Sequence, residues 1–100
     1  MENETKRQSV SDGRKFGLGN IYVTRAALGV LTITDMNNSL QRHVRGDWGS
    51  VGSDDWESND SALLDDSRLL SVYGSAVNEV FWIITEWDRS LTTILLPGDY

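Results

Sequence analysis

The stretch RHVRGDWG, residues 42–49, holds the residue types that general acid–base catalysis uses. His43 is the only histidine of the chain, and its side chain titrates near neutral pH. In a small hydrolase-like enzyme, His43 would act as a general base oriented by Asp47 or Asp88. The chain has no cysteine and no Gly-x-Ser-x-Gly motif, so no nucleophile in a recognisable motif accompanies the histidine.

The same stretch also fits the end of a helix, and we favour this interpretation. Arg42 and His43 would then lie in the last turn, where their donors and positive charge satisfy terminal carbonyl groups. Gly46 would end the helix. Asp47 would cap the following turn, and Trp48 would fill the core.

A second group of candidates lies in TEWDRS, residues 85–90. Glu86 and Asp88 would share a strand face, as paired carboxylates of a hydrolase could. A tight turn also favours aspartate, and Arg89 can pair with either acid, so we favour a hairpin turn. With one histidine and no cysteine, the chain lacks metal-ligand spacing, and we expect neither a metal nor another cofactor.

Residues 46–66 carry seven carboxylates and no lysine or arginine. In a helix, the first acids complement the positive end of the dipole, whereas Asp65 and Asp66 would lie at the unfavourable end. Acids kept at a local cost indicate a partner with a basic surface, although solubility alone is an equal alternative. Trp56 would supply an aromatic anchor. The predicted partner-binding residues are Asp54, Asp55, Trp56, Glu57, Asp60, Asp65 and Asp66.

The net charge of −6 is unevenly distributed along the 100 residues. From Phe16 onward, five basic residues face twelve acidic ones. Such a body repels phosphates, so we expect no direct nucleic-acid binding but a protein partner with a basic nucleic-acid-binding surface. No apolar run reaches the roughly 20 residues that span a bilayer, and the first residues lack the apolar region of a secretory signal. We therefore expect a cytoplasmic protein that does not bind membranes.

Residues 1–15 hold few large apolar side chains and are predicted to form a disordered tail, followed by one domain over residues 16–100. The segment 16–24 has the β-branched and aromatic residues of a strand. Thr24 would then cap a short helix over residues 25–31. The residues predicted for the buried face of that helix are Ala27, Leu28 and Leu31.

Two more helices are predicted before the C-terminal third. Asp35 would be the N-cap of the first, whose buried stripe recurs at four-residue spacing. Ser53 would cap the second, a short helix over residues 54–64. The stripe of the first helix is Met36, Leu40 and Val44, and the apolar anchors of the second are Trp56, Leu63 and Leu64.

The C-terminal third contains three strand-length segments, residues 67–73, 79–86 and 91–96, joined by connections of hairpin length. In the middle segment both alternating sets of residues are apolar, which predicts a central strand. Pro97 would end the sheet. The predicted fold class is α+β: two or three short helices packed on a small, mainly antiparallel sheet with a C-terminal three-stranded meander.

Three blocks of the chain resemble the signature blocks of a family of small bacterial proteins carried on plasmids and integrative elements. They are RHVRGDWG at 42–49, SRLLSVY at 67–73 and FWIITEWDRSLTTILLPGDY at 81–100. Members are often labelled plasmid-related protein or type I restriction subunit M. The resemblance runs from about Phe16 to the end of the chain and departs from the family pattern at Trp87 and Asp66. It implies a mobile-element setting and brings no catalytic residues.

These observations predict a non-enzymatic binding or inhibitor protein from a mobile element, of the anti-restriction or anti-CRISPR type. Its acidic face would act as a nucleic-acid mimic and compete for a basic groove of a host defence enzyme. Two alternatives stay open. One is the small hydrolase-like enzyme that uses His43 with Asp47 or Asp88, and the other is a structural or regulatory homodimer that uses the edge of the sheet.

Overall fold

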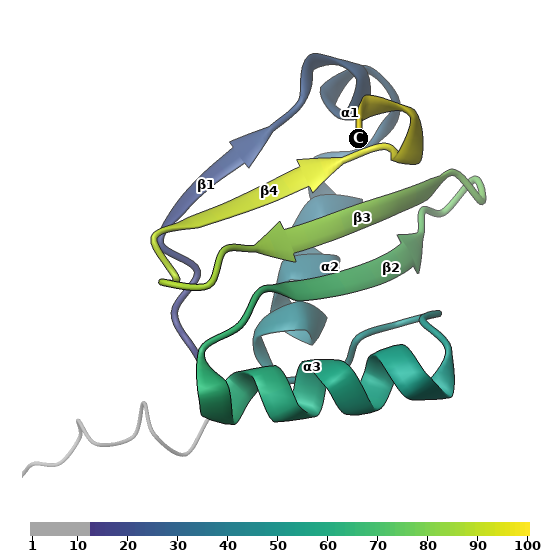
Figure 1. The fold of residues 1–100 in the computed structure, drawn as a ribbon. Helices are drawn as coiled ribbons and strands as arrows, with labels where there is room; N and C mark the ends of the chain where they lie inside the picture. The colour runs from purple at the N-terminus through teal and green to yellow at the C-terminus, as the bar shows by residue number, and fades with distance from the viewer. Residues whose placement is uncertain (1–12) are drawn as a thin grey trace, which may run out of the picture.

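A computed structural model describes residues 13–100 (Figure 1). The first twelve residues of the predicted tail lie outside the described residues. The last three are placed, and the Lys15 N–H donates a hydrogen bond of 2.8 Å to the carbonyl oxygen of Val44. None of the helices in residues 13–100 has the length and apolar character that crossing a bilayer requires.

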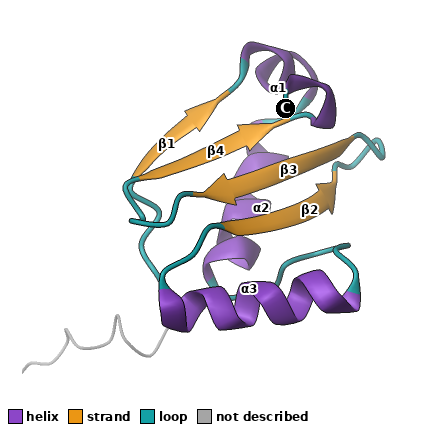
Figure 2. Cartoon of the chain, in the orientation of Figure 1, coloured by secondary structure: helices purple, strands orange, loops and turns teal. Residues whose placement is uncertain are grey.

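Within residues 13–100, three α-helices, one short 3-10 helix and one four-stranded sheet are present, which confirms the predicted α+β class. The elements are β1 (Asn20–Val23), α1 (Arg25–Val30), α2 (Ile33–Val44), α3 (Ser53–Asp65), β2 (Leu69–Gly74), β3 (Val80–Thr85), β4 (Leu91–Leu95) and the 3-10 helix η3 (Pro97–Asp99). Figure 2 shows α2 behind the sheet, α3 along the β2 edge and α1 beyond the end of β1. No α-helix covers the face of the sheet toward the viewer.

The strand order in the sheet is β1-β4-β3-β2. The pairs β2–β3 and β3–β4 are antiparallel, which confirms the C-terminal meander, and β1 joins parallel to β4. Strand β3 is central, as its two apolar sets predict, and Phe81 and Ile83 are fully buried. The helical crossover between β1 and the meander explains how the first strand reaches the far side of β4.

Two apolar clusters fill the space between the sheet and the helices. The larger joins α1 and α2 to the sheet, and its buried members are Ala27, Leu31, Met36, Leu40, Tyr73, Phe81, Ile83 and Ile94. The smaller lies under α3 and contains Trp48, Ala62 and Leu69. The predicted stripe of α2 is confirmed, because Met36, Leu40 and Val44 are all buried. The prediction that Leu28 is buried is wrong. Its side chain is 61% exposed, because successive helical residues are rotated by 100° and Leu28 therefore points away from the buried side of Ala27.

Two predicted helix caps are also wrong. Thr32, not Asp35, is the N-cap of α2. The Thr32 hydroxyl accepts from the Asp35 N–H at 3.0 Å, and the Asp35 carboxylate accepts from the Thr32 N–H at 3.1 Å, so the two form a capping box. Helix α3 begins at Ser53 with Gly52 as its N-cap, and no side chain caps it. The Thr24 cap of α1 is confirmed, since Thr24 Oγ1 accepts from the Ala27 N–H at 3.2 Å.

The outer edge of β2 is closed by backbone and side-chain groups. The loop after α2 runs beside it, where Ser50 N–H donates to the Val72 carbonyl oxygen at 2.8 Å and Val72 N–H donates to the Trp48 carbonyl oxygen at 3.1 Å. Gly49 lies between these bonds with a φ of 76°. The side-chain amide of Asn59, from α3, forms both hydrogen bonds to the backbone of Leu70, at 2.7 and 3.1 Å. The sheet therefore cannot add a strand at this edge.

Candidate functional site

Helix α3 presents most of the predicted partner-binding residues, and its buried side fixes it against the β2 edge. Asn59 and Ala62 are buried, and Trp56 and Leu63 pack against the smaller apolar cluster. The carboxylate of Asp60 accepts a hydrogen bond of 3.0 Å from the indole nitrogen of buried Trp48. This contact satisfies the polar group of a tryptophan that is otherwise fully packed.

The C-terminal end of α3 is capped from another part of the chain. Arg89, in the turn between β3 and β4, donates to the carbonyl oxygens of Ala62 at 2.9 Å and Ser67 at 2.6 Å. A guanidinium placed there satisfies carbonyl groups and offsets the negative end of the helix dipole. The predicted pairing of Arg89 with Glu86 or Asp88 is wrong, because its guanidinium bonds backbone carbonyls, among them that of Glu86.

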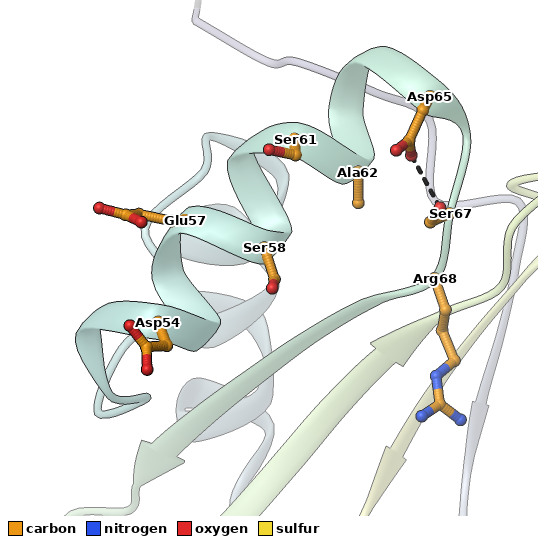
Figure 3. A pocket seen from close by; sticks show the side chains of 8 residues that line it. All are labelled: Asp54, Glu57, Ser58, Ser61, Ala62, Asp65, Ser67 and Arg68. Carbon is orange, nitrogen blue, oxygen red and sulfur yellow. Dashed lines mark hydrogen bonds between the residues drawn. The ribbon is translucent and has the colours of Figure 1, made fainter.

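The exposed side of α3 borders a groove of ≈ 510 Å³ (Figure 3). The groove is lined by Asp54, Glu57, Ser58, Ser61, Ala62, Asp65, Ser67 and Arg68. Asp65 accepts a hydrogen bond of 2.7 Å from the Ser67 hydroxyl. The Arg68 guanidinium donates to the Tyr100 hydroxyl at 2.6 Å rather than to a carboxylate of α3. Carboxylates and serine hydroxyls therefore form most of the polar lining of the groove.

Three carboxylates in the first half of α3 lack the hydrogen bonds that several other carboxylates of the domain accept. Outside the helix, four carboxylates accept hydrogen bonds that lower their pKa; they are Asp35, Asp47, Asp88 and Asp99. On α3, no hydrogen bond or ion pair within the described residues reaches the exposed side chains of Asp54, Asp55 and Glu57. No hydrogen bond of the fold therefore uses these three carboxylates; Asp54 and Asp55, in the first turn, experience only the favourable field of the helix dipole.

The predicted binding residues do not all share one surface. Asp54, Glu57 and Asp65 line the groove, whereas the Asp60 carboxylate is bound to Trp48. Trp56 is half-buried and packs toward the core, so it is less accessible than a protruding anchor. Asp66 is the C-cap of α3 with a φ of 59°, a left-handed conformation that aspartate tolerates better than most residues.

Leu64 is the apolar residue that protrudes from α3. It was predicted to anchor the helix to the core, but it is 89% exposed. Leu63 packs inward instead, and neighbours in a helix are 100° apart, so only one of the two can face the core. Sequence reasoning also missed Ser58, Ser61 and Arg68 as lining residues of the groove. The two serines could have been found from helical spacing, because Ser58 follows Asp54 by four residues and Ser61 precedes Asp65 by four.

His43 lies in the core and not at a surface. Its Nδ1 is 2.6 Å from Ser71 Oγ and its Nε2 is 2.9 Å from Thr85 Oγ1. The predicted role of His43 in satisfying helix-terminal carbonyls is therefore wrong. Burial, with a smaller effect of the Arg89 charge, lowers the pKa of His43 to about 3.

A chain of hydroxyl groups fixes the proton on the imidazole. Thr92 Oγ1 donates to the Leu18 carbonyl oxygen at 2.6 Å, so it must accept from Thr85 Oγ1, which is 2.7 Å away. Thr85 then accepts from His43, and the proton of the neutral ring lies on Nε2. Ser71 donates to Nδ1. Every polar atom of this buried side chain thus has a partner, as a structural histidine requires.

The other residues of the hydrolase hypothesis do not converge on His43. Asp47 accepts from Arg42 Nε at 2.8 Å and from the Gly49 N–H at 3.2 Å, which confirms that it caps the turn. Asp88 accepts from the Ser90 hydroxyl at 2.7 Å. Within the described part of the chain, no three His, Cys, Asp or Glu side chains converge on a point that could hold a metal ion.

Comparison of the chain with protein-family models, with curated proteins and with solved structures gives no match.

Proposed function

We propose that this chain is a non-enzymatic binding protein whose α3 face occupies a basic groove on a nucleic-acid-handling enzyme. The resemblance to proteins of mobile elements suggests a host restriction or CRISPR effector as the target, and the cytoplasm as the place of action. The protein would inhibit by competing with DNA or RNA for the groove.

One observation carries this proposal: the exposed carboxylates Asp54, Asp55 and Glu57 have no partner within the described residues. Outside α3, the carboxylates of Asp35, Asp47, Asp88 and Asp99 accept hydrogen bonds from other groups of the fold. A run of carboxylates on one helix, with no lysine or arginine in residues 46–66, creates a coherent negative field. That field steers the protein toward a surface that normally binds phosphates.

The chemistry of the groove supports the same class of partner. Arginine and lysine side chains of a nucleic-acid-binding groove bind carboxylates as they bind phosphate oxygens. Asp54, Glu57 and Asp65 line the groove together with Ser58 and Ser61. Leu64 adds an exposed apolar group on the same helix, which would be desolvated in a complex.

The buried position of His43 supports a role without catalysis. A general base must reach the proton that it abstracts, and both ring nitrogens of His43 are engaged by Ser71 and Thr85. The low pKa keeps the ring neutral at physiological pH. A binding function needs no reactive group at this position.

The test measures DNA binding and cleavage by purified type I restriction enzymes and RNA-guided nucleases with increasing amounts of this protein. We expect inhibition that weakens as salt rises, because exposed charges are screened within about 8–10 Å. The double variant Asp54→Asn/Glu57→Gln should lose inhibition by about tenfold or more. The control is Glu79→Gln/Glu86→Gln, which removes the same charge at two residues that do not line the groove and should inhibit like the wild type.

Equal inhibition by the two double variants would contradict the proposed face. Inhibition that is insensitive to salt would contradict the electrostatic mechanism. If the wild type leaves every tested effector active on its DNA, the proposed target class is wrong.

A further inference from the structure

As far as residues 13–100 show, the sheet has one open edge, at β1. Asn20 N–H donates to the Ser90 carbonyl oxygen and Thr24 N–H to the Ile94 carbonyl oxygen, each at 3.0 Å, so these residues face β4. Alternate residues of a strand direct their backbone groups to opposite sides. The N–H and C=O groups of Ile21 and Val23 therefore point away from β4. Among residues 13–100, no segment pairs with this side of β1.

Apart from its short length of four residues, β1 lacks the features that usually prevent strand addition. Proteins protect edge strands with charged residues, proline, bulges or a covering segment. The β2 edge has such a cover, made by Asn59 and the loop before α3. Residues 16–24 contain no charged residue and no proline. Ile21 and Tyr22 in β1 are 46% and 57% exposed.

The charge pattern favours a second copy of this chain as the occupant of the edge. A chain of net charge −6 repels its own copy over most of its surface. Residues 16–34 are the exception, because Arg25 is their only charged residue and they contain no carboxylate. Exposed apolar side chains also gather in this part of the chain; they are Ile21, Tyr22, Leu28, Val30 and Ile33.

We propose that two copies of this chain pair antiparallel through their β1 strands, about a twofold axis at Tyr22. In this register Ile21 of one copy lies opposite Val23 of the other, and each pair exchanges two backbone hydrogen bonds. All four outward groups of Ile21 and Val23 are then satisfied in both copies. The two Tyr22 residues face each other as a non-hydrogen-bonded pair. The neighbouring Val23 packs against the larger apolar cluster, so Tyr22 points to the opposite face of the sheet.

The pairing joins two four-stranded sheets into one continuous sheet. It leaves both α3 helices at the outer ends, because α3 packs along β2 on the far side of each sheet from β1 (Figure 1). The dimer does not depend on the function proposed for α3, and neither its formation nor its absence changes that proposal.

The first experiment is sedimentation equilibrium of the full chain over about 1–500 µM, a range suited to a small interface. We expect a monomer–dimer equilibrium for the wild type. Tyr22→Lys places two like charges opposite each other and should weaken the dimer by at least tenfold. Val77→Lys is the matched control, since it adds the same charge at an exposed site in the β2–β3 turn, and it should behave as the wild type.

The second experiment traps the pair covalently. The chain has no cysteine, so Tyr22→Cys introduces a single thiol at the twofold axis. Facing residues of a non-hydrogen-bonded pair lie about 4.5 Å apart between Cα atoms, within disulfide range. Oxidation should cross-link Tyr22→Cys rapidly at low protein concentration, while Leu64→Cys, exposed on α3, should stay monomeric.

A monomer at every concentration overturns the proposal. A dimer that Tyr22→Lys leaves intact also overturns it, and would place the interface on the open face of the sheet. Equal cross-linking of the two cysteine variants overturns the register. Circular dichroism of each variant establishes that it is folded.

Discussion

Arg89 Nη2 donates a hydrogen bond to the carbonyl oxygen of Ala62 at 2.9 Å, so the turn between β3 and β4 caps the C-terminal end of α3. The two residues are 27 positions apart in the chain. The cap binds the acidic helix to the meander, and it offsets the dipole at the end where α3 itself has no basic residue. Orientation of the candidate binding face therefore depends on a residue outside it.

Replacing this arginine should loosen α3. Arg89→Met keeps the length of the side chain but loses the charge and the three carbonyl contacts, and we expect it to lower the free energy of unfolding by about 2 kcal/mol. Arg89→Lys should lose about half as much. Urea unfolding and amide exchange at Leu64–Ser67 measure the effect. The control Arg25→Met, on α1, should change stability by less than about 0.5 kcal/mol.

The buried histidine should make stability depend on pH in a defined range. Its pKa is about 3 in the folded protein, below the ordinary value of 6.5 that it regains on unfolding. The unfolded chain therefore binds a proton below pH 6.5 that the folded chain does not, so stability is full above that pH and falls as the pH decreases toward 3. We expect the free energy of unfolding to be about 1.4 kcal/mol lower at pH 5.5 than at pH 7.5.

Urea unfolding at these two pH values measures the difference. His43 is the only histidine of the chain, so His43→Gln should remove most of the pH dependence while lowering stability at both values. A wild type with equal stability at both pH values would show that the imidazole is accessible to protons in the folded state.

The hydroxyl chain beside His43 should be sensitive to loss of one link. Thr85→Val keeps the shape but leaves the Nε2 proton of His43 without an acceptor in the core, at a cost of about 2–3 kcal/mol. Thr93→Val makes the same chemical change on the opposite face of the sheet, where Thr93 is only half-buried. It should alter stability by less than about 0.5 kcal/mol. Thermal or urea unfolding measures the stability of both variants. Equal effects would contradict the assignment of the proton to Nε2 of His43.

The cover of the β2 edge should depend on Gly49. This residue has a φ of 76°, and a Cβ atom there would collide with the carbonyl oxygen of Val72. Gly49→Ala should destabilise the protein by about 3 kcal/mol or more and expose the edge. Gly52→Ala, three residues later, has open space and no positive φ, so it should change stability by less than about 1 kcal/mol. Unfolding curves and thioflavin fluorescence during storage report on stability and on edge pairing.

The positions of the strands could be predicted well from the sequence, whereas the residues that cap the helices could not. The runs at 67–73, 79–86 and 91–96 became β2, β3 and β4 because their β-branched and aromatic residues suit a pleated, half-buried surface. The caps of α2 and α3 could not be placed, since several adjacent residues are suitable: Thr32 and Asp35 cap each other, and Gly52 precedes Ser53. Such choices depend on one or two backbone angles.

The acidic residues of the candidate site could be predicted from the sequence, but the direction in which each side chain points could not. The acidity of α3 is visible in composition, but which of Leu63 and Leu64 faces outward depends on where the helix packs. His43 finds its partners 28 and 42 residues away, at Ser71 and Thr85, and the parallel placement of β1 arises from the helical crossover. Contacts between distant parts of the chain leave no local pattern in a single sequence.

The closed edge at β2 limits how far these molecules could assemble. A sheet with two open edges can add chains without end and grow into a fibre. Here Asn59 satisfies the backbone of Leu70, and the loop residues Trp48 and Ser50 satisfy that of Val72. With a single edge able to accept a strand, growth by strand addition terminates after one event.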